Sequence, residues 1–309
     1  MSGVLGMIKE FAVEPSVMAD WNHFRVLWED FGVAKGRLIS RYPKTWNRDV
    51  YELAQKLNEK PVRAASICET IRQGKNRFIP SRRDYNPNEP WVANATEQMN
   101  KKPFHAIVAA ANPANHRSVL VAGELDRQDP RYKIDGSNKV PRTAEALAEC
   151  AALLVKESEE ILMVDPNFRS EERRFVETFK EIVALRRTSA LLFRTCELHV
   201  RRPEIYNRAI QEANFRRQLE RVVPSGVTLR IHFWDQRGGG EKLHARFLLT
   251  ELGGLQYDYG LDEGEGHGDM TWVRLMDEQM WETVRRDYAC AGGSFELAPD
   301  CLINISGKG

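Results

Sequence analysis

The sequence predicts an α/β protein in which a sheet carries helices on both faces, preceded by a mainly helical N-terminal region. Two observations predict this class. From residue 141 onward, helical and strand patterns alternate along the chain, which is typical of a sheet covered by helices. Between residues 15 and 75, apolar residues recur at three- and four-residue spacing, the period of a helix. A proline-rich stretch at 80–100 separates the two patterns, so we expect an N-terminal region over 1–100 and a second domain over 101–309.

The N-terminal region shows an apolar stripe at helical spacing. Its aromatic members are Trp21, Phe24, Trp28 and Phe31. The period continues over 51–57, and 64–73 reads as a further helix that ends at Gly74. Aromatic residues at this spacing are typical of the core-facing side of a helix. The region carries no recognisable chemistry, so we expect it to bind a partner protein or nucleic acid.

The second domain begins with two short apolar strands and then alternates between helices and strands. We expect strands at 104–110 and 118–123, followed by an exposed polar loop over 126–141. Proline, serine and glycine mark the boundaries of the later elements. The expected order is helix 141–156, strand 160–166, helix 170–187 with Ser170 as its N-cap, strand 189–196, helix 202–222, strand 227–234, a hairpin of 243–250 with 255–259, strand 269–276 and helix 277–288.

The composition narrows the class of protein. The 309-residue chain has a formal net charge of +1, with 42% hydrophobic and 29% charged residues, a balance typical of globular proteins. No field of the whole molecule draws it onto nucleic acid, so such a contact requires a local patch. The apolar runs are too short to span a bilayer, and residues 1–7 lack the features of a secretory signal. The five cysteines show no CxxC spacing, which argues against structural zinc and favours free thiols in the cytoplasm.

One tract, 241–251, combines residue types that act on phosphate esters. His244 is followed two residues later by Arg246 and five residues after that by Glu251. Because side chains at i and i+2 share one face of a strand, the tract predicts His244 and Arg246 side by side. A cation can hold a phosphate while an imidazole attacks phosphorus or transfers a proton. This tract is therefore the predicted catalytic centre.

The tract resembles the motif of the phospholipase D superfamily, which reads His-x-Lys, four residues, Asp. The spacing is the same here, with Arg246 in the position of the lysine and Glu251 in that of the aspartate. The family's following Gly-Ser and Asn correspond to Gly260-Leu261-Asp262, which contains neither serine nor asparagine. The order of helices and strands over about 140–290 is also similar to one half of such an enzyme. The resemblance implies a phospholipase D-like mixed sheet flanked by helices within 101–309.

The resemblance also implies a mechanism. The family uses two histidines, of which one forms a phosphohistidine intermediate and the other protonates the leaving oxygen. Because this chain carries one such motif, we expect a homodimer with His244 of both copies at the interface. Arg246 is expected to grip the phosphate, and Glu251 either to orient a histidine or to pair with Arg246. The mechanism requires neither a metal ion nor a cofactor.

Further substrate-binding residues are expected around this centre. Asp165 ends its predicted strand, the position at which ligands bind in such sheets. The basic stretch 194–221 reads as a phosphate-tracking surface; the alternative is a solvated helix face paired with nearby glutamates. The substrate-binding candidates are Asp165, Asp258, Asp262, Arg201, Arg202 and Lys242.

Two functions from different classes follow from these patterns. The first is a cytoplasmic phosphodiesterase, most readily a nuclease that binds DNA or another nucleic acid, of the kind found among effectors of prokaryotic anti-phage defence. The second is a catalytically degenerate phospholipase D-like subunit that holds nucleic acid or partner proteins within a larger complex. The missing serine and asparagine motivate the second. A phospholipid hydrolase is less favoured, because the sequence contains no apolar segment suited to a membrane surface.

Overall fold

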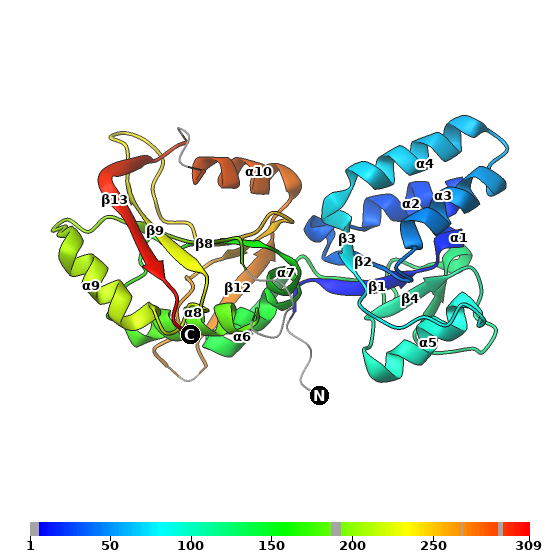
Figure 1. Ribbon diagram of the computed structural model, residues 1–309, viewed down its shortest axis with the longest axis horizontal. Coiled ribbons are helices and arrows are strands. Elements are labelled where there is room, and N and C mark those ends of the chain that lie inside the picture. Colours follow the sequence, from blue (N-terminus) through cyan, green and yellow to red (C-terminus); the bar gives the residue numbers. More distant parts are fainter. Residues whose placement is uncertain (1–5, 187–192, 267, 290–292) are drawn as a thin grey trace. The chain divides into compact units, whose positions relative to one another are not determined.

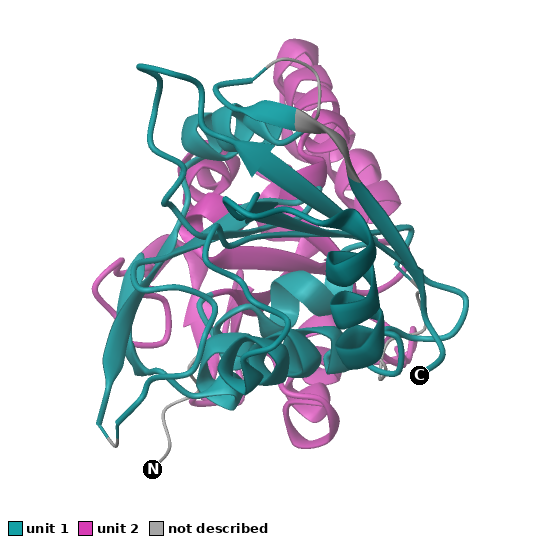
Figure 2. Cartoon of the chain, turned by 90° about the vertical axis from the view of Figure 1, so that its left-hand side faces the viewer, with its two compact units in different colours: residues 1–7, 136–309 teal, residues 8–135 magenta. Residues whose placement is uncertain are grey.

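The computed structural model describes residues 6–186, 193–266, 268–289 and 293–309. The chain divides into two compact units (Figure 2). Residues 8–135 form one, which we call the N-terminal unit, and residues 1–7 with 136–309 form the other, the C-terminal unit. No helix in the described part of the chain is both long and apolar enough to cross a membrane.

The N-terminal unit contains a five-stranded parallel sheet in the order β3-β2-β1-β4-β5 (Figure 1). Its strands are β1 (Lys9–Val13), β2 (Arg37–Arg41), β3 (Phe78–Pro80), β4 (Ala106–Ala109) and β5 (Val119–Val121). Its helices are α1 (Pro15–Ala19), α2 (Trp21–Asp30), α3 (Trp46–Leu57), α4 (Pro61–Gln73) and α5 (Trp91–Lys101), with short 3-10 turns at Val33–Lys35, Lys75–Arg77 and Ala122–Glu124.

Side-chain alternation along β1 builds two cores on this sheet. Phe11 and Val13 face one cluster, which the apolar sides of α2, α3 and α4 complete. Ala12 faces the opposite cluster, which includes Phe104 and the inward side of α5. Helices therefore cover both faces of the sheet (Figure 1), as a parallel sheet requires.

The expectation of a mainly helical region over 1–100 missed the strands of its sheet. The aromatic stripe does lie on α2, but β1, β2 and β3 also fall within these residues. Each of these strands has three to five residues. Buried parallel strands of this length show no alternation, so the stronger helical period hides them. The expected boundary near 100 also differs from the observed division near 135, because β4 and β5 pair into the same sheet as β1.

The C-terminal unit contains an eight-stranded mixed sheet in the order β13-β9-β8-β7-β10-β11-β12-β6. Strands β7, β8 and β9 are parallel to one another, and the remaining pairings are antiparallel. The strands are β6 (Ser137–Pro141), β7 (Glu160–Val164), β8 (Thr195–Arg201), β9 (Thr228–Asp235), β10 (Phe247–Leu249), β11 (Gly254–Tyr257), β12 (Met270–Leu275) and β13 (Glu296–Ser306). The helices are α6 (Ala144–Cys150), α7 (Ala152–Glu157), α8 (Arg173–Ala184), α9 (Arg208–Leu219) and α10 (Glu278–Asp287).

Helices flank this mixed sheet, which confirms the expected α/β class. On one face, α10 packs over a cluster that includes Trp234 and Phe247. On the opposite side, Phe233 of β9 contacts Phe215 of α9, with ring centroids 5.9 Å apart. The helices and strands expected from 141 onward are found with shifted ends, whereas β13 and β6 were not expected. Helix α8 begins at Arg173, so Ser170 is not its N-cap. Residues 189–192 of the expected strand 189–196 lie outside the described residues.

Candidate functional site

Several of the predicted site residues lie where the parallel strands of the C-terminal unit end. Asp165 follows β7, and Arg201 is the last residue of β8. Strand β10 runs antiparallel to β7 and pairs Phe247 with Val164, which places Arg246 at this same end. We call this region the carboxyl edge of the C-terminal unit. Ligands of open α/β sheets bind at such edges.

Asp165 is the buried centre of this edge. Its carboxylate is inaccessible to solvent and accepts hydrogen bonds from the backbone N–H of Asn167 and of Leu261, each at 2.9 Å. Burial raises the pKa of Asp165 above its ordinary value, while these hydrogen bonds and the charge of Arg246 oppose the shift. The carboxylate thus fastens the 260–262 loop to the end of β7.

The two other predicted aspartates have internal partners. Asp262 lies 2.8 Å from Arg142 and 3.4 Å from Arg174, and its side chain is 7% exposed. Asp258 pairs with Arg274 at 3.1 Å. Both carboxylates are therefore paired with arginines of this unit. They are less available to bind a substrate than the sequence suggested.

The segment that carries His244 is irregular, and this corrects one expectation. Strand β10 begins at Phe247, so His244 and Arg246 do not share a strand face. The chain departs from the strand because Leu243 is buried in the core and its carbonyl accepts a hydrogen bond from Arg201. This anchoring leaves the neighbouring side chain of His244 exposed at the edge.

The hydrogen bond of His244 decides which ring nitrogen is basic. Its Nδ1 lies 2.9 Å from the backbone carbonyl of Lys242. A carbonyl only accepts, so Nδ1 carries the proton and donates it, and the lone pair is on Nε2. An exposed Nε2 with a free lone pair is the form of imidazole that can act as nucleophile or base. The side chain of Lys242 is itself exposed.

Arg246 is the inner member of the motif. Its side chain is 18% exposed, and its Nε lies 3.9 Å from an oxygen of Asp165. This Nε is buried and, within the described residues, donates no hydrogen bond. A buried guanidinium with an unused donor is suited to receive an anion.

Glu251 is not part of this edge. It follows the opposite end of β10 and accepts hydrogen bonds from the backbone N–H groups of Glu159 and Glu160, at 2.7 and 3.0 Å. These contacts hold the start of β7, whereas His244 and Arg246 lie beyond its far end. The expectation that Glu251 orients a histidine has no support in this arrangement.

A cavity of 410 Å³ opens at the same edge. Arg201 lines it and also binds the Leu243 carbonyl, so the cavity adjoins the His244 segment. Ser170 is 1% exposed, and its buried Oγ has no hydrogen-bond partner among the described residues. Arg202 lines the cavity as well and pairs with Asp235 at 2.8 Å. The remaining lining residues are Pro166, Asn167, Phe168, Arg169, Glu171, Pro203, Gln211, Phe215 and Phe233.

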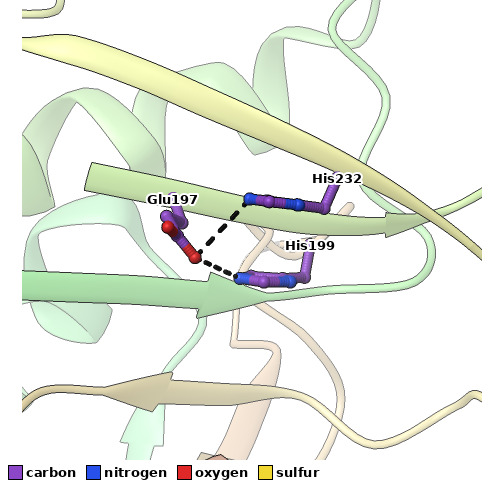
Figure 3. A group of neighbouring side chains, drawn as sticks. All are labelled: Glu197, His199 and His232. Carbon is purple, nitrogen blue, oxygen red and sulfur yellow. Dashed lines mark hydrogen bonds and ion pairs between the residues drawn. The ribbon is translucent and has the colours of Figure 1, made fainter. Parts of the chain in front are cut away.

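The structure also reveals a buried polar group that the sequence interpretation missed. Glu197 and His199 of β8 and His232 of β9 lie on one face of the sheet, with His199 paired to His232 in register (Figure 3). The Glu197 carboxylate is 3.1 Å from Nε2 of His199 and 3.6 Å from Nε2 of His232. Arg230 lies 3.1 Å from the same carboxylate group. The signal in the sequence was the alternation of these polar residues along two adjacent strands.

The donor types of this cluster suit a transition metal, but their arrangement does not. Nδ1 of His199 accepts a hydrogen bond from the indole N–H of Trp234 at 3.0 Å, so the proton of that ring is on Nε2. The imidazoles of His199 and His232 are stacked with planes 6° apart, so their in-plane lone pairs run side by side and do not converge (Figure 3). Metal-bound histidines instead donate their second nitrogen to an acceptor. We interpret the cluster as a buried network of hydrogen bonds and charges.

No protein-family model matches the chain. No curated protein sequence matches it either. Conclusions about its function therefore rest on the geometry of the carboxyl edge, where Asp165, Arg201, His244 and Arg246 come together from three separate segments.

Proposed function

We propose that the C-terminal unit is a metal-independent phosphodiesterase of the phospholipase D type that cleaves nucleic acid. The observation that carries this proposal is the hydrogen bond from Nδ1 of His244 to the Lys242 carbonyl. It leaves a basic Nε2 exposed on an anchored segment, beside a cavity lined by arginines. Imidazole attack at a phosphate requires this tautomer and a neighbouring cation.

The chemistry follows from these groups. The lone pair of His244 Nε2 attacks phosphorus, and the bond from phosphorus to the leaving oxygen breaks with its electron pair on that oxygen. The leaving oxygen takes a proton from a second imidazole. Water then attacks the phosphohistidine, its proton passes to the second imidazole, and the P–N bond breaks to restore Nε2. Arg246, with its unused Nε donor, stabilises the charge that develops on the phosphate oxygens.

The second imidazole is proposed to be His244 of another copy of the chain. The other described histidines near this edge, His199 and His232, are both buried, and His199 is bound to Trp234, so neither can reach a substrate. A two-fold homodimer with both exposed His244 rings facing one cleft supplies the acid and the nucleophile. Arg201 and Arg202, which line the adjacent cavity, are proposed to contact the phosphates that flank the cleaved bond.

The test is cleavage of plasmid, single-stranded DNA and RNA by the full chain and by His244→Ala. We expect the substitution to lower kcat by about a thousandfold or more, with cleavage by the wild type unchanged in EDTA. His23→Ala is the matched control, because His23-Phe24-Arg25 has the same spacing but lies on α2 of the N-terminal unit. Wild-type activity that disappears on chelation, or that survives in His244→Ala, contradicts the proposal.

A second candidate is a non-catalytic subunit that binds a phosphate backbone. The observation that favours it is the commitment of Glu251, Asp258 and Asp262 to internal partners, which leaves His244 as the exposed reactive group of the motif. The same assay separates the two functions. Salt-sensitive binding without cleavage, unchanged in His244→Ala and weakened in Arg201→Ala, is the result expected of this second function.

A further inference from the structure

A second cavity lies within the N-terminal unit, at the carboxyl ends of β2 and β3. These strands are parallel and pair Arg41 with Pro80, so the segments that follow them emerge side by side. The cavity between these segments has a volume of 640 Å³. Its lining residues are Pro43, Lys44, Thr45, Arg48, Ser81, Arg82, Arg83, Asp84, Tyr85 and Pro87.

Ser81 is the most informative residue of this cavity. It is 4% exposed, and its Oγ is buried without a hydrogen-bond partner among the described residues. Its backbone is nevertheless fixed, because its carbonyl accepts hydrogen bonds from Arg83 and Lys102, each at 3.2 Å. Arg83 is in turn directed inward by its ion pair with Glu10. A buried hydroxyl on a fixed segment is costly when it is unsatisfied, so a ligand that bonds to it would be stabilised.

The charges around Ser81 favour an anion. Lys44, Arg48 and Arg82 line the cavity, against the single carboxylate of Asp84 in the lining. Arg48 is 68% exposed, and its ion-pair contacts to Asp49 and Glu52 are both long, at 3.8 Å. These loose contacts leave its guanidinium able to turn toward a bound anion.

The start of α3 supplies a further positive end. This helix has 12 residues and begins at Trp46, directly after the cavity-lining Thr45. No side chain caps it. The Trp46 N–H donates to the Pro43 carbonyl at 2.9 Å, whereas the next N–H groups of a first helical turn have no acceptor within the helix. Such N–H groups, together with the helix dipole, bind phosphate oxygens. Three independent features therefore meet at one cavity: a buried hydroxyl, cationic side chains and an open helix start.

The position of the cavity indicates the kind of phosphate compound. A dinucleotide would lie across the switch point of this sheet, between β1 and β4. There the carboxylate of Glu14 already accepts a hydrogen bond from the Ala110 N–H at 2.8 Å, and the turn after β1 begins Glu14-Pro15 without glycine. The cavity lies on the other side of β1, beside β2 and β3, where a single phosphate group can be held.

We propose that the N-terminal unit binds the phosphate group of a small phosphate monoester in this cavity. The Oγ of Ser81 donates to one phosphate oxygen, the first turn of α3 donates to another, and Lys44, Arg48 and Arg82 balance the charge. The site is separate from His244, which belongs to the other compact unit. It assigns a binding role to a region in which the sequence alone indicated no chemistry.

The test is isothermal titration of the full chain with AMP, inorganic phosphate and adenosine. We expect AMP and inorganic phosphate to bind and adenosine not to bind. Ser81→Ala should weaken AMP binding about tenfold or more, the loss typical of a hydrogen bond to a charged group. Arg48→Ala should weaken it several-fold, whereas Lys56→Ala, which removes an exposed cation from the other end of α3, should leave it unchanged.

Both variants are expected to fold as the wild type does, because Ser81→Ala removes an atom without a partner among the described residues and Arg48 is exposed. A loss of binding therefore reports on the site itself. His244→Ala should bind AMP as the wild type does, which separates this site from the proposed phosphodiesterase. Equal affinity in the wild type, Ser81→Ala and Arg48→Ala overturns the proposal. So does equal binding of adenosine and AMP, or no binding of any probe at 10 mM, which is about a hundredfold above a typical 0.1 mM affinity.

Discussion

The carboxyl edges of the two units are built alike but use their charges differently. At each edge, parallel strands end beside a cavity lined by arginines, and each cavity contains a buried serine whose Oγ has no partner among the described residues. In the C-terminal unit that serine is Ser170, and in the N-terminal unit it is Ser81. The shared placement follows from the direction of the strands, because the segments that leave parallel strands converge at one edge.

The difference lies in the ion pairs. At the C-terminal edge, Asp262 is held by Arg142 and Arg174, and Arg202 is held by Asp235. At the N-terminal edge, Arg48 reaches its carboxylates only at 3.8 Å. Charged side chains that are paired within the unit stabilise the edge but are less available to bind a ligand. Under the two proposals, the C-terminal edge acts through His244 and Arg246, whereas at the N-terminal edge Arg48 is loosely paired and Arg83 is held by Glu10.

The largest effect that tests this contrast concerns stability. Asp262→Asn removes the charge that two arginines share at a side chain 7% exposed, so we expect the C-terminal unit to lose about 3 kcal/mol of unfolding free energy. Asp84→Asn is the matched change at the N-terminal edge, where the side chain is exposed, and should alter stability by less than about 0.5 kcal/mol. Urea denaturation with hydrogen exchange resolved by unit measures both. Equal losses in the two variants would remove the contrast.

A second effect concerns the response of the C-terminal unit to acid. Burial lowers the pKa of His199 from the ordinary 6.5 to about 4, with Glu197 opposing that shift. The folded pKa is depressed, so the unfolded chain binds the proton first, and stability is lost as the pH falls from 6.5 toward 4. The full shift corresponds to a loss on the order of 3 kcal/mol for this fully buried ring.

Burial alone raises the pKa of Glu197, but its contacts with His199 and His232 hold that pKa below the usual value. Its contribution therefore disappears only at still lower pH, which adds to the same trend. Denaturation of the C-terminal unit at pH 7, 6 and 5 should show a steady decline. His199→Gln cannot titrate, so its stability should be lower at pH 7 but should depend less on pH. Identical slopes in wild type and variant would exclude His199 as the responsible group.

The sequence revealed the C-terminal fold better than the N-terminal one for a physical reason. Amphipathic helices such as α8 and α10 show a clear helical period, and the turns between elements carry proline and glycine. The strands β1, β2 and β3 are short and buried, so they lack a period of their own. Strand β6 was hidden because its pairing with β12 spans a long stretch of sequence.

The site shows a similar division. Asp165 was predicted from the end of its strand, Arg246 from the motif spacing and Arg201 from the basic stretch, and all three lie at the carboxyl edge. Glu251 was misplaced, because spacing along the chain does not reveal that a short strand separates it from His244. The Glu197–His199–His232 cluster depends on the register between β8 and β9. The serine hydroxyl groups without a partner among the described residues could not be predicted, because the sequence does not show which acceptors lie near a side chain in the folded protein.

The smallest expected effect tests whether the C-terminal edge truly contains an unused hydroxyl. Ser170→Ala removes an Oγ without a partner among the described residues, so stability should stay the same or rise by up to about 1 kcal/mol. Ser158→Ala is the control, because that equally buried Oγ donates to the Leu154 carbonyl at 2.7 Å, and its loss should cost about 1 kcal/mol. Thermal unfolding of both variants measures the difference. If Ser170→Ala costs as much as Ser158→Ala, the Oγ is bonded within the fold, and the two edges no longer share this feature.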